Sequence, residues 1–144
     1  MGWHDSRIYA LAFMPDEFEF VFDLDYILKW VHPGPDETYF KFWIAAATLV
    51  FDNVYEVDID IGSNDGGLDI LNVTREDPRA PRNAEHISKN CEWLWILDCL
   101  QGEIKFRSAG YKQYLRTYPV LGSQQLDPNT RGLPFQRGRT EFPE

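Results

Sequence analysis

The chain has 144 residues, of which 44% are hydrophobic and 26% are charged, and its formal net charge at pH 7 is −9. A chain of this length and composition can bury a core as one domain, so global disorder is excluded. Because an acidic protein repels phosphate groups, nucleic acid and anionic membranes are excluded as partners, and we expect another protein of basic character.

The negative charge is concentrated in the first four fifths of the chain. Residues 1–115 contain 20 acidic and 10 basic residues, a net charge of −10, whereas residues 116–144 contain 3 acidic and 4 basic residues, a net charge of +1. From 118 onward the chain is also rich in proline and glycine and has little periodicity. We therefore expect a single domain over 1–117 and an irregular or disordered tail over 118–144.

The composition gives no sign of export or of a membrane span. No segment has the ~20 consecutive apolar residues of a membrane helix, and the first residues lack a basic region followed by an apolar stretch. The two cysteines, Cys91 and Cys99, do not make a disulfide framework. These features predict a cytoplasmic protein.

Two segments alternate between apolar and acidic side chains. The first has apolar residues at Phe18, Phe20, Phe22, Leu24 and Tyr26, with Glu19, Asp23 and Asp25 between them. The second has apolar residues at Tyr55, Val57, Ile59 and Ile61, with Glu56, Asp58 and Asp60 between them. Because side chains of a strand point alternately to its two faces, both segments are predicted to be strands with an apolar inner and an acidic outer face.

The other elements follow from shorter patterns. Strands are expected at 8–13, 18–28, 39–43, 48–51, 54–61, 68–73, 93–99 and 103–107. Loop 62–67 is expected to be a hairpin between its two flanking strands, and residues 75–90 a surface loop with a helical turn within 84–90. Ala45–Ala47 could form one helical turn, and 111–118 fits strand or helix, with strand favoured. The sum predicts a mainly β fold, an antiparallel barrel-like or sandwich sheet of about eight strands with little helix.

No catalytic residue can be assigned from the motifs. His4, Asp5 and Ser6 are consecutive, and neighbouring side chains of an extended chain point in opposite directions, so they cannot act together as a triad. Trp93 and Trp95 could form a stacking platform, but the apolar residues between and after them favour a core strand. No cofactor is predicted.

The acidic strand faces provide the candidate binding residues, Asp23, Asp25, Asp58 and Asp60. The members of each pair lie about 7 Å apart along their strand. If the two strands were neighbours, the four carboxylates would meet and could hold a hard cation such as Ca²⁺. The histidines lack metal-ligand spacing, and a solvated acidic face explains the pattern more simply, so no metal site is predicted.

Four stretches carry a resemblance to a known group of proteins. They are Trp3–Ala10, which includes Trp-His-Asp-Ser, Phe22–Ile27 with Trp30, Ala47–Val54 and Gly110–Arg116. Together they resemble a family of small uncharacterised bacterial proteins over roughly 3–118. The N-terminal stretch is also similar to some immunity proteins of bacterial toxin systems. The resemblance implies no catalytic residues.

Three functions are consistent with the sequence. The first is a non-enzymatic, immunity-like module that binds a basic protein through its acidic sheet face. The alternative is a hydrolase or metal-binding enzyme built on the clustered aspartates with His4 or His32. The third is a subunit whose exposed strand edges pair with a second copy to give a homodimer.

Overall fold

The computed structural model of the protein describes residues 3–32, 34–35, 41–122, 131–137 and 140–141. Within these residues the chain is mainly β, as predicted, with ten strands and two 3₁₀ turns. The elements are β1 (Ile8–Met14), η1 (Pro15–Glu17), β2 (Glu19–Val31), β3 (Lys41–Asp52), β4 (Tyr55–Ile61), β5 (Ile70–Arg79), η2 (Ala84–His86), β6 (Glu92–Cys99), β7 (Gly102–Ser108), β8 (Gly110–Leu115), β9 (Val120–Gly122) and β10 (Thr140–Glu141).

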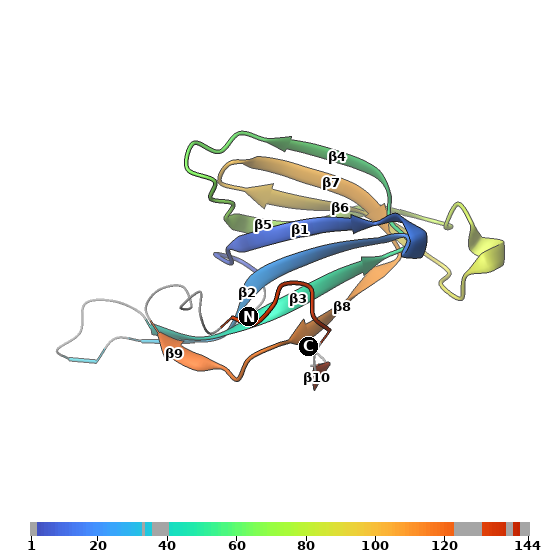
Figure 1. Cartoon of the computed structure of the whole chain (residues 1–144). Coiled ribbons are helices and arrows are strands. Elements are labelled where there is room, and N and C mark those ends of the chain that lie inside the picture. Colours follow the sequence, from blue (N-terminus) through green and yellow to red (C-terminus); the bar gives the residue numbers. More distant parts are fainter. Residues whose placement is uncertain (1–2, 33, 36–40, 123–130, 138–139, 142–144) are drawn as a thin grey trace.

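The strands form two antiparallel sheets, which lie one above the other in Figure 1. Sheet one has the order β1-β2-β3-β8-β10, with β9 also paired to β3, and sheet two has the order β4-β7-β6-β5. At one corner β1 meets β5, where Arg7 and Asp69 form an isolated bridge. The predicted sandwich of antiparallel strands is therefore confirmed.

The core lies between the two sheets and is rich in aromatic rings. Sheet one contributes Phe20, Phe22 and Phe51, and sheet two contributes Trp95 and Phe106. Phe51 and Phe106 make an edge-to-face contact with ring centroids 4.7 Å apart, a favoured geometry for aromatic pairs. The alternation in β2 and β6 places Phe20, Phe22 and Trp95 inward, as the sequence predicted.

The alanine run does not form a helical turn. Residues 41–52 are one continuous strand, in which Ala45, Ala46 and Ala47 are fully buried and pair with Tyr26, Asp25 and Leu24 of β2. Hydrogen bonding to neighbouring strands on both sides outweighs the helix preference of alanine.

The predicted hairpin at 62–67 is also wrong, because β4 and β5 are the two opposite edges of sheet two. β3 pairs with β8 as far as Asp52 and Gly110, and the pairing resumes between Tyr55 of β4 and Arg107 of β7. The segment β3–β4 and the segment β7–β8 therefore stay paired as both pass from sheet one to sheet two. For this reason β4 pairs with β7 and not with β5.

Strand β5 extends to Arg79, through residues that were predicted to be a loop. Pro78 is tolerated because β5 is an edge strand and its register with β6 shifts between Glu76 and Arg79. Asp77, with φ of 50°, lies at this bulge. The remainder of the predicted loop does contain the expected turn, η2.

The segment after 117 is not entirely irregular. β9 pairs with β3 and β10 pairs with β8, so both belong to sheet one. Residues 131–137 contain no strand or helix and lie across the outer face of sheet one, where Thr48 Oγ1 donates to the carbonyl of Gln136 at 2.6 Å. The rest of the predicted tail lies outside the described residues.

Candidate functional site

Asp23 and Asp25, two of the predicted binding residues, do not lie on an open acidic surface. They occupy the outer face of β2, and their exposed fractions are only 5% and 1% because residues 131–137 cover this face. The alternation correctly assigned them to the face opposite the core. It could not reveal that a later segment of the chain covers that face.

Two arginines neutralise these buried carboxylates. Arg116 Nη2 lies 2.7 Å and Arg131 Nη2 2.8 Å from Asp23 Oδ1. Arg131 also donates to Asp25, which accepts a second hydrogen bond from Tyr9 Oη at 3.1 Å. The guanidinium of Arg131 stacks 3.6 Å from the centroid of the Tyr9 ring. Buried carboxylates with such partners stabilise the position of the C-terminal segment and are not available to a ligand.

Asp58 and Asp60 are exposed, on the edge strand β4 of the other sheet. They pair in register with Lys105 and Glu103 of β7. The four predicted aspartates therefore do not meet, because β2 and β4 belong to different sheets. No group of three or more His, Cys, Asp or Glu side chains with metal-binding geometry exists among the described residues.

Among the described residues, His4 and His32 belong to no group of three or more side chains that could hold a metal ion. His4 lies beside β5, where its Nδ1 donates to the carbonyl of Leu71, and its Nε2 is 3.6 Å from Asp5. His32 follows the end of β2 at Val31. The carboxylate cluster that the hydrolase or metal-enzyme hypothesis requires is thus not formed by the described part of the chain.

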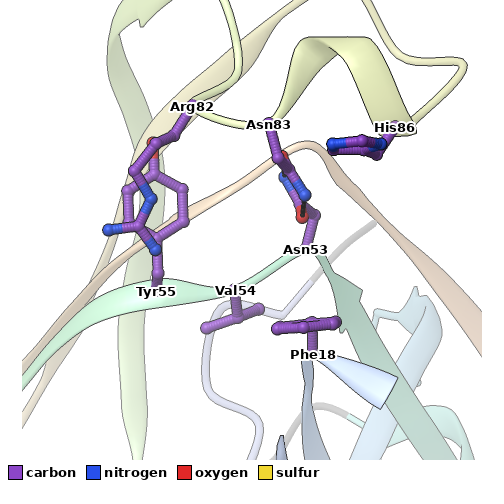
Figure 2. A pocket seen from close by; sticks show the side chains of 7 residues that line it. All are labelled: Phe18, Asn53, Val54, Tyr55, Arg82, Asn83 and His86. Atoms are coloured by element: carbon purple, nitrogen blue, oxygen red, sulfur yellow. Dashed lines mark hydrogen bonds between the residues drawn. The ribbon is translucent and has the colours of Figure 1, made fainter. Parts of the chain in front are cut away.

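A concave surface does exist at the end of the sandwich where β1 turns into β2. Its largest hollow has a volume of about 460 Å³ and is lined by Phe18, Asn53, Val54, Tyr55, Arg82, Asn83 and His86 (Figure 2). Two further hollows, of about 400 and 410 Å³, adjoin it, and Phe18 lines all three. Phe18 is therefore at the centre of this concave surface.

Phe18 has an unusual backbone conformation. It ends η1 with φ of 56° and ψ of 38°, in the left-handed region that disfavours a bulky residue. Its carbonyl accepts a hydrogen bond from Val54 N at 2.8 Å, which joins the β1–β2 turn to the start of β4. Phe18 as a whole is 61% exposed. The sequence had assigned Phe18 to the inner face of a strand, and this prediction is wrong because β2 begins only at Glu19.

An apolar patch extends from Phe18 along the edge of the sandwich. Phe13, Phe18, Val54 and Val57 line one continuous hollow, and we call these four residues the Phe18 surface. Phe13 is 50% exposed although its ring stacks on Phe20 with centroids 4.6 Å apart. Large apolar side chains gathered in this way are typical of interaction sites.

The opposite wall of the largest hollow is polar and held by side-chain contacts. Asn53 and Asn83 face each other in Figure 2 and exchange two amide hydrogen bonds of 3.0 and 2.9 Å. Arg82 stacks over the Tyr55 ring at 4.0 Å from its centroid. These contacts attach the loop that carries η2 to the β3–β4 turn.

The polar wall contacts a buried carboxylate through Tyr55. Glu92 is fully buried, accepts a hydrogen bond from Tyr55 Oη, and lies 2.8 Å from Arg79 Nε. Burial, together with this hydrogen bond to Glu92, raises the pKa of the Tyr55 hydroxyl. Tyr55 therefore remains protonated at neutral pH and presents its ring to Arg82.

The sequence contains one local signal for this site. Met14-Pro15-Asp16-Glu17 has the composition of a turn, and the residue that ends such a turn often adopts a left-handed conformation. Phe18 occupies that position. The contribution of Asn53, Arg82 and Asn83 depends on contacts between separate segments, and no local pattern indicates it.

Comparison of the chain with protein-family models, with curated proteins and with solved structures gives no match. Among the described residues, no helix is long and apolar enough to cross a lipid bilayer.

Proposed function

We propose that this protein is a non-enzymatic protein-binding module, and that it binds through the Phe18 surface. The observation that carries the proposal is the exposed side chain of Phe18, held by a left-handed backbone conformation at the centre of a hollowed apolar surface. A folded protein tolerates the cost of such a conformation where the position serves a function. A rigid aromatic ring beside shallow hollows is the usual anchor of a protein interface.

The charge next to this surface favours a basic partner. β4 carries Glu56, Asp58 and Asp60, all exposed, and begins beside Phe18. Charges at the rim of an interface accelerate association with an oppositely charged partner and select against wrong partners. An immunity-like role, in which this surface covers a basic toxin, is the form of this function that the resemblance of the N-terminal stretch supports.

Affinity capture from the native host tests the proposal. The wild-type chain and a Phe18→Ala variant are immobilised and exposed to lysate at low and at high salt, and retained proteins are identified by mass spectrometry. We expect a basic protein that the wild type retains at low salt and releases at high salt. Phe18→Ala should reduce its retention about tenfold, as expected for the loss of an interface anchor.

Tyr118→Ala is the matched control. Among the described residues, Tyr118 is the most exposed large apolar side chain outside the Phe18 surface, at 89%. This variant should retain the same protein as the wild type. Equal retention by Phe18→Ala and wild type would exclude the Phe18 surface as the binding site.

A further inference from the structure

The free edge of β4 is the most regular unpaired strand edge of sheet two. β4 has one register shift with β7, between Tyr55 and Asp58, where Glu56 has φ of 53°, and it then pairs regularly from Asp58 to Ile61. It has no partner on its other side among the described strands. β5, at the opposite edge, has two register shifts, contains Pro78 and is bridged to Arg7. Bulges, proline and bridging chain segments protect an edge from further pairing, and β4 has none of these between Asp58 and Ile61.

The two faces of β4 differ in chemistry. Ile59 pairs with Ile104 and lies on the core side. Val57, two residues before Ile59 in the same strand, is on the same side. Both are nevertheless about two fifths exposed, on a strand at the edge of the sheet. Asp58 and Asp60 lie on the outer side. The edge of β4 therefore presents unpaired backbone groups, with apolar side chains on the core side and acidic side chains on the outer side.

The separation of acidic and apolar side chains on β4 determines which strands could pair with its free edge. A second copy of β4 in antiparallel pairing would place aspartates opposite aspartates, and like charges in such positions destabilise a sheet. A segment that alternates basic and apolar residues would place its charges against Asp58 and Asp60. Its apolar side chains would cover Val57 and Ile59.

We propose that the partner adds an extended segment to the free edge of β4 as a new strand, with Lys or Arg opposite Asp58 and Asp60 and apolar side chains on Val57 and Ile59. The inference rests on the proposed function and defines the partner's chemistry. Main-chain hydrogen bonds supply the contact, and the alternation of side chains supplies the specificity.

Synthetic peptides test this proposal with the full chain. The probe is a peptide of about nine residues that alternates Lys and Val, with a fluorescent label, and the readout is fluorescence anisotropy at low salt. It should bind at least about tenfold more tightly than a Glu/Val peptide of the same pattern. It should also bind more tightly than a peptide of the same composition with its lysines and valines in two blocks, because only strict alternation separates the two faces.

Backbone methylation and charge reversal make the test specific. Methylation of every second amide nitrogen removes the donors on one edge of the peptide, so two methylated peptides are made, one with the odd-numbered and one with the even-numbered amides methylated. The peptide whose methyl groups face β4 should not bind, and the other should bind as the unmethylated peptide does. The double variant Asp58→Lys/Asp60→Lys should no longer bind the Lys/Val peptide and should bind the Glu/Val peptide instead. Glu76→Lys, on the outer face of β5 at the other edge of the sheet, is the control and should bind as the wild type does.

Two results would overturn strand addition. One is equal affinity for the alternating and block peptides, and the other is equal loss of binding by both methylated peptides. Phe18→Ala separates the two proposals, because it should weaken capture of the native partner while leaving the β4 edge intact. If the peptide fails to bind but capture depends on Phe18, only strand addition is wrong.

Discussion

Arg131 and Asp23 are 108 positions apart in the sequence, yet Arg131 Nη2 donates to Asp23 Oδ1 at 2.8 Å within a buried contact. Arg116 donates to the same oxygen and also to the carbonyl of Arg131. The basic end of the chain therefore neutralises carboxylates of the acidic body. Part of the difference in charge between the two ends of the sequence is therefore used inside the folded protein, where Arg116 and Arg131 bind Asp23.

Removal of Arg131 should destabilise the protein strongly. Arg131→Ala leaves Asp25 and, in part, Asp23 as buried carboxylates without their main partner, which costs more than the pair itself contributes. We expect the free energy of unfolding to fall by about 3 kcal/mol. Urea denaturation at pH 7 measures this change.

Arg137→Ala is the control for that experiment. Arg137 comes from the same segment and pairs with Glu19, but its side chain is 42% exposed. Glu19 is 13% exposed, so the pair is open to solvent on the arginine side, and we expect it to be worth about 1 kcal/mol or less. If both variants lose the same stability, the buried position of Arg131 has no special importance.

Asp69 should contribute to the pH dependence of stability. Hydrogen bonds from Arg7 hold its pKa below the usual 3.8, with a smaller contribution from Gln101. Because the pKa is lower in the folded state, this contribution is complete above the unfolded value and disappears as pH falls through the folded value. Asp69→Asn should therefore destabilise the protein at pH 7 and progressively less below about pH 4.

Thermal unfolding between pH 3 and pH 7 measures this difference. Arg7→Met removes the main cause of the shift and should reproduce the same pH profile. A constant difference in stability between wild type and Asp69→Asn across this range would show that ionisation of Asp69 is not coupled to folding.

Gly102 should not tolerate a side chain. Its φ is 148°, and a Cβ atom would lie 2.1 Å from the carbonyl oxygen of Asp60. Gly102→Ala should therefore lower the free energy of unfolding by about 2 to 3 kcal/mol, by straining the β6–β7 turn against β4.

Gly110→Ala provides the comparison, since a Cβ atom there has no neighbour within 4 Å. It should change stability by less than about 0.5 kcal/mol. Chemical denaturation of both variants tests the pair, and a Gly102→Ala protein as stable as the wild type would contradict the close approach to β4.

Phe18 should be a site where stability and binding oppose each other. Asparagine adopts the left-handed region more readily than phenylalanine, and Phe18 is mostly exposed. Phe18→Asn should therefore raise the free energy of unfolding by about 1 kcal/mol while it weakens partner capture. A loss of stability would show instead that the ring packs usefully against its neighbours.

Much of the fold was predictable because alternation is local. Residues 93–99 and 103–107 were correctly predicted to be strands, and they form β6 and β7. The pairing of β4 was not predictable. It depends on the continued pairing of the segment β3–β4 with the segment β7–β8 across the two sheets. The composition of the loop at 62–67 favoured instead a hairpin between β4 and β5, which does not form.

The candidate site was less predictable than the fold. Alternation placed Asp58 and Asp60 on an outer face correctly, and it placed Asp23 and Asp25 on an outer face that proved to be covered. The hollow around Phe18 combines three separate segments, and its polar wall depends on the amide pair between Asn53 and Asn83. A role for Asp58 and Asp60 in binding stays a prediction.

The sequence by itself determined the mainly β fold, the inward direction of Phe20, Phe22 and Trp95, and the acidic character of the body. These properties follow from the alternation of neighbouring residues and from composition. Only the tertiary structure decided which acidic face is buried and which is open, because that depends on where a distant segment docks. Arg131 reaches Asp23 and Asp25, while Asp58 and Asp60 remain exposed on the edge strand β4.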